Sequence, residues 1–570
     1  MSSTPPKKNH LLTVLVEDYF QVGAFEKLIR QRNWSNFEPR YERNTLKTLD
    51  LLDEFDTKGT FFILGWIAEQ NPGFVREIAS RGHEIASRGY YHRSLKNLTA
   101  DEFREDLRRT NRVLEDASGQ KIIGYRSAEK LTFGQDEWIF DVLAEEGFVY
   151  DASFQPKKRT EKNSRFAHKL NTNGTSLWEF PYSTRDFGVG LLPISGGNYF
   201  RQIPYTLMRH AVADWDKSFE EPFVFYFHVW ELDPEQPRIS AASRYNRIRH
   251  YRKLDKMEWI IRENLSLYNF TDAAGFLGIK DDIRIALHDP KGEALQLPSA
   301  ASVSRHETEH AVTIVIPCYN EQEALPYLAN TLRSVEARLT DCGYTVEFIF
   351  VDDCSKDETF EILTELFDSK ENVRIVKHEV NRGVAAGIMT GLRAAGTEIV
   401  CSMDCDCTYD PHELAEMVPL LHDDVDMVTA SPYHRMGGVR NVPGWRLFLS
   451  KGASFLYRRV LRSKMDTYTS CFRVYRKSSM NGIDLKRTGF LGVAEMLGKL
   501  DLRGGKIVEF PAVLEVRLFG LSKMKTVKTI AGHISLLGNL AKMRWFGKIE
   551  PIQPYLAEGT LTITKENLRK

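Results

Sequence analysis

The sequence predicts an α/β protein with two separate cores, one in each half of the chain. Three observations support this prediction. The chain has 570 residues, whereas single cores stop growing at roughly 250–300 residues. In both halves, short apolar runs alternate with amphipathic helical stretches, as in proteins built on parallel sheets. In the second half several apolar runs end in acidic residues, so carboxylates should gather at one edge of its sheet.

Composition excludes some classes of function. Lys+Arg and Asp+Glu both total 77, and no basic block suggests a nucleic-acid partner. Glu17 and Asp18 interrupt the first apolar run before it could serve as a signal peptide, and no run approaches the roughly 18 residues that span a bilayer. All seven cysteines follow residue 310, which disfavours a secreted disulfide framework. We expect a cytoplasmic protein, with a peripheral position on the inner face of the cell membrane left open.

The elements expected in the first half follow in order. Apolar runs that should form strands occupy residues 11–16, 59–64, 121–126 and 223–230. Stretches with helical spacing occupy residues 71–82 and 136–147. The polar residues near the ends of these runs are Asp18, His83, His92, Arg126 and His228. A carboxylate and imidazoles at strand ends would suit a divalent-metal hydrolase, although any one of them is more often an ordinary polar residue.

These residues lie in stretches that resemble the NodB-homology polysaccharide deacetylases, over roughly residues 10–275. The stretches are "LVEDYFQVGAFE", "TKGTFFILGWIAEQNPGFVREIASRGHEIAS", "LPISGGNYFRQIPY" and "HVWELDPEQPRIS". The resemblance implies a deformed (β/α) barrel of deacetylase type in residues 1–275. It also implies a vestigial metal site whose residues are Asp18, His92, Arg126 and His228.

Three positions depart from the pattern of that family. Its catalytic aspartate corresponds to Leu15, the first histidine of its metal pair to Arg88, and the proline after its motif arginine to Ala128. Leucine cannot accept a proton, and arginine offers no lone pair. A guanidinium about 4 Å from a divalent ion would be repelled by roughly 8 kcal/mol at an effective dielectric of about 20. We therefore expect a domain that kept its fold and lost its hydrolase activity, and that binds glycan, positions the second domain or is structural only.

Residues 276–310 mix charge, proline, serine and alanine without periodicity, and we expect a linker there. The second domain should span residues 311–550, with a tail at 551–570. Its expected strands occupy residues 312–320, 344–353, 372–379, 398–406 and 424–433. Helices should lie between these strands, and ligands should bind at the carboxyl ends of the strands.

Motifs with chemical meaning stand at these strand ends. "VTIVIPCYNE" places Pro317, Tyr319 and Glu321 on a strand-to-helix turn, and "NRGVAAGIMTGL" supplies glycines that let a helix begin close to a ligand. In "SMDCDCTYDP", Asp404 and Asp406 stand two residues apart after a strand. Two such carboxylates can share Mg²⁺ or Mn²⁺, which also grips a diphosphate. One Asp-x-Asp is weak evidence, but several ordered elements together are strong.

The order of these elements resembles family 2 glycosyltransferases of the GT-A (Rossmann-like) fold, and especially dolichyl-phosphate mannose synthases and their polyprenyl-phosphate relatives. Further similar stretches are "VDDCSKDET", "GWRLFLSKGASFLYRRVL", "DTYTSCFRVYRK" and "RLFGLSKM". The resemblance implies a GDP- or UDP-sugar donor. The residues implied to bind its nucleotide, diphosphate and metal are Pro317, Tyr319, Glu321, Val351, Asp353, Asp404, Cys405 (through its backbone), Asp406, Arg517 and Lys523, with Asp404 and Asp406 as the metal ligands.

The residues implied to bind the acceptor depart from the pattern of the mannose synthases. Pro432 stands where the synthases have an arginine, with Arg435 close by, and Lys451 replaces an arginine that contacts phosphate. These changes leave polyprenyl phosphate and a glycan hydroxyl open as acceptors. A hydroxyl would need a base, and Glu495 is the candidate by resemblance, with a solvated helix carboxylate as the equally strong alternative. The segment 527–546 has apolar residues at helical spacing plus cations, so it should either lie in a membrane surface or pack on its own domain.

The leading hypothesis is a metal-dependent, inverting glycosyltransferase in cell-surface polysaccharide or glycolipid synthesis. A bifunctional deacetylase and transferase is the second hypothesis, and Leu15 and Arg88 argue against it. A glycan-binding or scaffold protein is the third, and it would require an inactive second half. No Gln-x-x-Arg-Trp motif is found, which argues against a processive polymer synthase.

Overall fold

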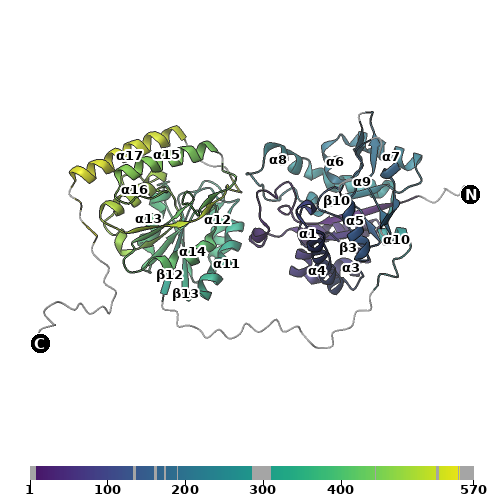
Figure 1. Cartoon of the computed structure of the whole chain (residues 1–570), viewed down its shortest axis with the longest axis horizontal. Coiled ribbons are helices and arrows are strands. Elements are labelled where there is room, and N and C mark those ends of the chain that lie inside the picture. Colours follow the sequence, from purple (N-terminus) through teal and green to yellow (C-terminus); the bar gives the residue numbers. More distant parts are fainter. Residues whose placement is uncertain are drawn as a thin grey trace, which may run out of the picture. The chain divides into compact units, whose positions relative to one another are not determined.

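The computed structural model of the chain describes residues 8–131, 136–158, 163–172, 175–188, 190–284, 310–442, 444–520, 526–547, 549 and 551–552. The chain forms two compact units, each with its own sheet (Figure 1). Unit 1 comprises Met1–Trp34, Pro39–Pro237 and Ala242–Leu295, and unit 2 comprises Ser35–Glu38, Arg238–Ala241 and Gln296–Lys570. Most of the expected linker lies outside the described residues, so the domain boundaries at 275, 310 and 550 stay predictions.

A curled sheet of nine strands lies at the centre of unit 1. Its order is β10-β1-β2-β3-β4-β5-β7-β6, with β11 beside β1. The end strands β10 and β6 are not neighbours in this order, so the deformed barrel is open. All neighbours are parallel except β6 and β7. The strands are β1 (Asn9–Val16), β2 (Thr60–Ile63), β3 (Glu84–Ser87), β4 (Gly124–Tyr125), β5 (Tyr150–Asp151), β6 (His168–Thr172), β7 (Thr175–Glu179), β10 (Val224–His228) and β11 (Asn269–Thr271), and β8 (Thr184–Asp186) and β9 (Leu191–Pro193) form a separate hairpin.

Amphipathic helices connect the parallel strands of unit 1. They are α1 (Tyr41–Glu54), α2 (Gly65–Gln70), α3 (Pro72–Ser80), α4 (Ala100–Ser118), α5 (Glu137–Glu145), α6 (Gly197–Gln202), α7 (Tyr205–Ser218), α8 (Arg244–Tyr251), α9 (Met257–Leu267) and α10 (Ala273–Leu277). Helix α4 begins with a capping box, in which the Thr99 side chain accepts from Glu102 N–H and the Glu102 carboxylate accepts from Thr99 N–H. It ends at Gly119, which has the left-handed φ of 68°.

Unit 2 is built on a seven-stranded mixed sheet with the order β14-β13-β12-β15-β18-β16-β19. Only β18 is antiparallel to its neighbours, and the apolar runs predicted neither β18 nor β19. The strands are β12 (His310–Cys318), β13 (Tyr344–Asp352), β14 (Val373–Lys377), β15 (Ile399–Ser402), β16 (Met427–Ser431), β18 (Arg473–Arg476) and β19 (Ile507–Pro511). A separate parallel pair consists of β17 (Gly438–Val439) and β20 (Val513–Leu514).

Helices cover both faces of this sheet (Figure 1). One core cluster lies beneath α11 (Leu325–Asp341), α12 (Thr359–Phe367) and α14 (Leu414–Met417). The other lies beneath α13 (Val384–Ala394), α15 (Gly444–Val460), α16 (Phe490–Leu502) and α17 (Thr526–Phe546). The α/β class predicted for both halves is therefore confirmed.

Candidate functional sites

The turn after β12 is tied to the loop after β13. Asn320 has a φ of +52°, which asparagine tolerates, and its N–H donates to Ser355 Oγ at 2.9 Å. Lys356 N–H donates to Asn320 Oδ1 at 2.7 Å, and Glu321 N–H donates to Thr359 Oγ1 at 2.7 Å. Because β12 and β13 are parallel neighbours, both loops leave the same edge of the sheet.

Four charged side chains meet at this edge of unit 2. They come from the segments after β12, β15 and β20, and they are Glu321, Asp404, Asp406 and Arg517. Arg517 Nη1 lies 3.5 Å from Asp406 Oδ2, and its Nη2 pairs with the Glu321 carboxylate. Arg517 Nε donates to the Phe519 carbonyl at 2.6 Å, which orients the guanidinium. The structure thus brings together four of the residues implied to bind the donor.

Negative charge is in excess in this cluster, since three carboxylates face one guanidinium. Burial, and then the charges of Asp406 and Glu321, together raise the pKa of the Asp404 carboxyl to about 7 against the opposing effect of Arg517. Carboxylate oxygens are the ligands that Mg²⁺ and Mn²⁺ prefer, and a divalent cation would relieve this repulsion, so the donor set fits such an ion. Among the described residues no group of three or more His, Cys, Asp or Glu side chains could hold a metal by itself.

Two residues implied to bind the nucleotide also have structural roles. The Val351 side chain is fully buried in the core beneath α13 and is not available to a base. The Asp353 carboxylate accepts hydrogen bonds from His378 Nδ1 at 2.7 Å, Arg382 N–H at 2.8 Å and Gly383 N–H at 2.6 Å, so it fixes the start of α13. Its neighbour Asp352, which the motif comparison passed over, keeps a buried Oδ2 without a hydrogen-bond partner in the described residues.

The glycines of the "NRGVAAGIMTGL" segment were expected to let a helix begin close to a ligand. At two of them the atoms that approach closely belong to the protein itself. Gly383 has a φ of +93°, and a Cβ there would lie 2.7 Å from the Thr488 carbonyl oxygen. A Cβ on Gly387 would lie 3.0 Å from Pro317 Cβ. Pro317 therefore contacts α13, and these glycines allow that helix to approach β12 and residue 488 closely.

The candidate base Glu495 is engaged elsewhere. It lies on α16 and is 2% exposed, so the alternative of a solvated carboxylate is wrong. Lys486 N–H and Arg487 N–H donate to its two oxygens at 3.1 and 2.8 Å, and Lys499 Nζ lies 2.8 Å away. Both oxygens are engaged in this way, so Glu495 anchors residues 486 and 487, and its role as a general base stays a prediction.

The other predicted site residues are more simply placed. The Cys405 side chain is in the core, and only its backbone is available to a ligand, as expected. Tyr319 is half-buried beside the turn. Lys451 is exposed on α15, with its Nζ 5.4 Å from the centre of the Tyr433 ring. Lys523 lies outside the described residues.

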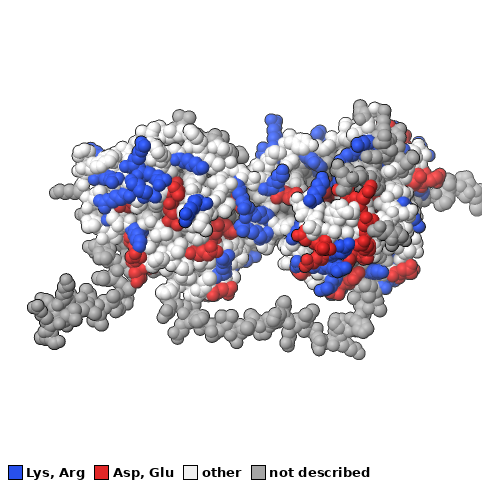
Figure 2. Space-filling model, in the orientation of Figure 1, with Lys and Arg blue, Asp and Glu red and all other residues white. Residues whose placement is uncertain are grey.

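Helices α15 and α17 present an apolar and basic outer face. Arg544 Nη1 donates to the Val460 carbonyl at 2.6 Å, and Tyr457 OH lies 2.9 Å from His533 Nδ1, so the two helices are bound together. The large exposed apolar side chains on them are Phe448, Phe455, Leu456, Ile530, Ile534, Trp545 and Phe546. Neither helix contains Asp or Glu, and Figure 2 shows blue side chains gathered over this part of unit 2. Within the described part of the chain, no helix is both long and apolar enough to cross a membrane.

In unit 1 a buried ionic cluster lies where β1, β3 and β10 end. Arg88 Nε donates to Glu17 Oε2 at 3.0 Å, and His92 Nε2 lies 3.5 Å from the same oxygen. His228 Nδ1 lies 2.6 Å from Glu17 Oε1. Burial favours protonated Glu17, but the charges of Arg88, His228 and His92 outweigh it and hold the pKa of that carboxyl well below its usual range. The Arg88 guanidinium therefore supplies the positive charge that a bound cation would otherwise supply.

The carboxylate of this cluster is Glu17, whereas the motif comparison had placed Asp18 there. Asp18 accepts hydrogen bonds from the N–H groups of Tyr19, Arg40 and Tyr41 at 2.9, 2.6 and 3.0 Å, and takes no part in the cluster. Strand alternation could have found Glu17, since it follows Leu15 at an interval of two residues. Leu15 itself adds no carboxylate to this cluster, and the carboxylate that Glu17 supplies is bound to Arg88.

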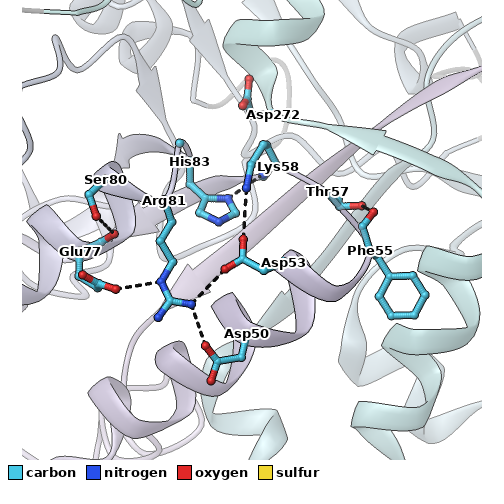
Figure 3. A network of polar contacts seen from close by, with 12 residues as sticks. Asp50, Asp53, Phe55, Thr57, Lys58, Glu77, Ser80, Arg81, His83 and Asp272 are labelled. Carbon is cyan, nitrogen blue, oxygen red and sulfur yellow. Dashed lines mark hydrogen bonds and ion pairs between the residues drawn. The ribbon is translucent and has the colours of Figure 1, made fainter.

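His83 lies at the opposite edge of the sheet because it precedes β3, whereas Arg88 follows it. Its Nδ1 accepts from Gly59 N–H at 3.2 Å, within a network that includes Lys58, Asp53 and Arg81 (Figure 3). Burial lowers the pKa of His83 to about 3, so the ring is neutral. His83 does not belong to the candidate metal site.

Arg126 is also separate from the ionic cluster. Its Nη1 donates to Thr13 Oγ1 at 3.1 Å. Thr13, Leu15 and Glu17 alternate along β1 and its end, so Leu15 stands between the residues that contact Arg126 and Arg88. The Leu15 side chain belongs to the core of unit 1, and it gives Arg126 no counter-charge.

Comparison with known families agrees with this division of the chain. Residues 313–483 match the family described as Glycosyl transferase family 2. Residues 29–130 match the family described as Polysaccharide deacetylase, and residues 153–277 match the Domain of unknown function (DUF3473). Both resemblances inferred from the sequence motifs are confirmed.

Individual relatives cover one half of the chain each. The dolichol-phosphate mannosyltransferase of Pyrococcus furiosus is 30% identical over 250 residues, 44% of this chain and 68% of that protein. The polyprenol monophosphomannose synthase of Mycolicibacterium smegmatis is 28% identical over 218 residues, 37% of this chain and 80% of that protein. The glucosyl-3-phosphoglycerate synthase of Mycobacterium tuberculosis, solved with Mn²⁺, UDP and glucosyl-3-phosphoglycerate, is 16% identical, has a TM-score of 0.32, and is matched over 42% of this chain and 81% of that one.

Proposed function

The chain belongs to glycosyl transferase family 2 through unit 2, which is joined to a polysaccharide deacetylase domain in unit 1, and from this we propose a specific transferase activity. The enzyme moves a sugar from a GDP- or UDP-sugar to a polyprenyl phosphate or a glycan acceptor, with inversion at the anomeric carbon. The observation that carries the proposal is the meeting of Glu321, Asp404, Asp406 and Arg517 at one edge of the sheet.

Each group in this cluster has a defined task in such a reaction. Asp404 and Asp406 would hold Mg²⁺ or Mn²⁺, which when bound supplies positive charge against the leaving diphosphate. Arg517, already oriented by the Phe519 carbonyl, adds a fixed cation for the same charge. The turn at Asn320 holds the adjoining strand ends in place, so the donor meets an organised surface.

The acceptor that fits best is a phosphate. A phosphate oxygen is already a nucleophile, whereas a hydroxyl needs a base to remove its proton. The one acidic residue implied for that task, Glu495, has both oxygens occupied. The names of the two relatives with the most similar sequences given above also refer to dolichol phosphate and polyprenol phosphate acceptors.

A lipid-linked acceptor requires contact with a bilayer, and the joined helices α15 and α17 offer a suitable face. Exposed aromatic and aliphatic side chains can enter the headgroup region while lysine and arginine meet anionic lipids. This favours the membrane alternative for residues 527–546 over simple packing, although the inner side of α17 does pack on the domain. All seven cysteines are free, which supports a position on the cytoplasmic side.

Unit 1 would contribute no deacetylation, because Arg88 fills the cluster and pairs with Glu17. One observation favours the bifunctional alternative, namely that Glu17 places a carboxylate beside His92 and His228. Release of acetate from an N-acetylated glycan would decide between the two. If acetate appears and His92→Ala abolishes it, the inactive reading of unit 1 is wrong.

The transferase proposal is tested by a screen of UDP- and GDP-sugars with Mn²⁺, with and without polyprenyl phosphate. We expect one nucleotide-sugar to be turned over, and transfer to the lipid to depend on the metal. A donor that is consumed only with a hydroxylated glycan would exclude the phosphate acceptor. Absence of binding and turnover with every nucleotide-sugar would overturn the proposal as a whole.

A further inference from the structure

Arg126 is a buried cation without a charged partner. Its side chain is 1% exposed, and its Nε has no hydrogen-bond partner among the described residues. No carboxylate in the described part of the chain forms an ion pair with it, and its one side-chain hydrogen bond is to the neutral Thr13 hydroxyl. Burying a charge is strongly unfavourable unless it is paired, so this guanidinium lacks a compensating group.

Aromatic rings surround the same guanidinium. Its central carbon lies 4.3 Å from the centre of the Tyr226 ring, 4.7 Å from that of Tyr182 and 5.9 Å from that of Phe62. Cation–π contact compensates only part of the lost hydration. Tyrosine faces beside a cation are also surfaces on which the apolar face of a sugar ring can stack.

A second cation, Lys130, shares the Tyr182 ring. Its Nζ donates to Tyr199 OH at 2.5 Å and lies 5.3 Å from the centre of the Tyr182 ring. Burial, and then the positive charges of Arg249, Lys157 and Arg126, together lower the pKa of Lys130 to about 7. No carboxylate in the described residues pairs with Lys130 either. Two cations thus repel each other across one aromatic ring.

The nearby carboxyl groups cannot neutralise these cations. Glu17 is committed to Arg88 and the two histidines. Burial, and then the charge of Asp151 and a hydrogen bond to it, raise the pKa of Glu179 well above its usual range in spite of the opposing charge of Arg126, and this favours the neutral carboxyl. The edge of unit 1 formed by the ends of β4, β7 and β10 therefore carries uncompensated positive charge.

We propose that Arg126 and Lys130, together with the rings of Tyr182, Tyr199 and Tyr226, form a binding site for a sugar that carries a carboxylate or phosphate group. The site lies at the carboxyl ends of parallel strands, where ligands of open α/β sheets bind. The guanidinium and the ammonium pair with the anionic group, and the half-buried Tyr199 ring beside Lys130, rather than the buried rings of Tyr182 and Tyr226, contacts the sugar ring. Unit 1 would then recognise acidic glycan while unit 2 transfers sugar.

The test is isothermal titration calorimetry of the full chain with glucuronate, glucose 6-phosphate and glucose. We expect one or both anionic sugars to bind and glucose not to bind, and the pair of anionic sugars separates a carboxylate source from a phosphate source. Lys130→Gln should weaken the anionic sugar by about tenfold or more, as for loss of a charged hydrogen bond. Lys130→Arg should keep binding. Lys121→Gln, an exposed lysine before β4 at the opposite edge, is the matched control and should behave as the wild type.

Binding of glucose as tight as that of the anionic sugars would overturn the proposal, and so would unchanged binding in Lys130→Gln. Inorganic phosphate is a further arm, and binding as tight as that of glucose 6-phosphate would refute the assignment of a sugar. Arg126→Gln should also lose binding. Its melting temperature shows whether the fold persists, and Lys130→Gln keeps the test decisive if Arg126→Gln does not fold.

Discussion

Replacing Arg88 by methionine removes the cation of the buried cluster in unit 1. Glu17 is fully buried, and Arg88 Nε donates to it at 3.0 Å. Breaking a buried ion pair by removing one partner costs about 3–5 kcal/mol, because the other charge is left uncompensated. His228 and His92 stay beside the carboxylate, so we expect the lower end, about 3 kcal/mol of unfolding free energy near pH 8.

The pH dependence of this loss follows from the sign of the pKa shift. The surrounding cations hold the pKa of Glu17 below its value in the unfolded chain, in spite of burial. Such a carboxyl stabilises the fold above the unfolded pKa, and the stabilisation disappears as the pH falls through the folded pKa. Without Arg88 the pKa of Glu17 rises. At acidic pH Glu17 then becomes protonated and neutral, which limits the loss of unfolding free energy in the variant. The difference between wild type and Arg88→Met should therefore shrink from about pH 8 to about pH 5.

The measurement is hydrogen exchange of peptides from β1 and β3 in the full chain as a function of urea, which reports on unit 1 separately from unit 2. Glu17→Gln combined with Arg88→Met should recover much of the stability, since no charge is then left buried. Arg108→Met, which removes an exposed arginine paired with Glu146, is the control and should change little. A loss below about 0.5 kcal/mol for Arg88→Met at pH 8, within the range of ordinary surface substitutions, would refute the reasoning.

Three further predictions concern unit 2. Asp404→Asn should abolish nucleotide-sugar turnover and its dependence on Mn²⁺, whereas His92→Ala should leave turnover unchanged, and a steady-state assay of nucleotide release checks both. Glu495→Gln should destabilise unit 2 by about 2 kcal/mol, because charged hydrogen bonds to the 486–487 backbone are weakened; a loss of kcat with unchanged urea stability would contradict its anchoring role. Phe455→Asp should weaken sedimentation with phosphatidylglycerol vesicles by about tenfold, whereas Phe187→Asp, an equally exposed aromatic of unit 1, should not.

The gathering of acidic residues in unit 2 was predictable because it rests on a general property of parallel sheets. Asp404 and Asp406 follow one strand and Glu321 follows its neighbour, so parallel pairing alone brings their segments to one edge. Arg517 was found only through a family motif, since it follows a two-residue strand that no periodicity reveals. In unit 2, the acidic residues at strand ends could therefore be predicted from the strand pattern, whereas a site residue in an irregular loop such as Arg517 could not.

The sequence was least informative about acidic side chains that can face either a ligand site or nearby backbone N–H groups. The motif comparison chose Asp18, but the chain turns after β1, and the backbone N–H groups of Tyr19, Arg40 and Tyr41 capture that carboxylate. Glu495 was a plausible base by position, yet the local fold directs backbone N–H groups onto it. Such contacts join segments without regular periodicity, and spacing along the sequence does not encode them.

The bonds between the Asn320 turn and residues 355–359 bear on any attempt to alter which nucleotide the proposed transferase accepts. Ser355, Lys356 and Thr359 each bond to the turn after β12. Grafting either loop from another transferase by itself would leave polar groups of the other unmatched. A chimera that changes donor preference should therefore exchange both loops together, as one cassette.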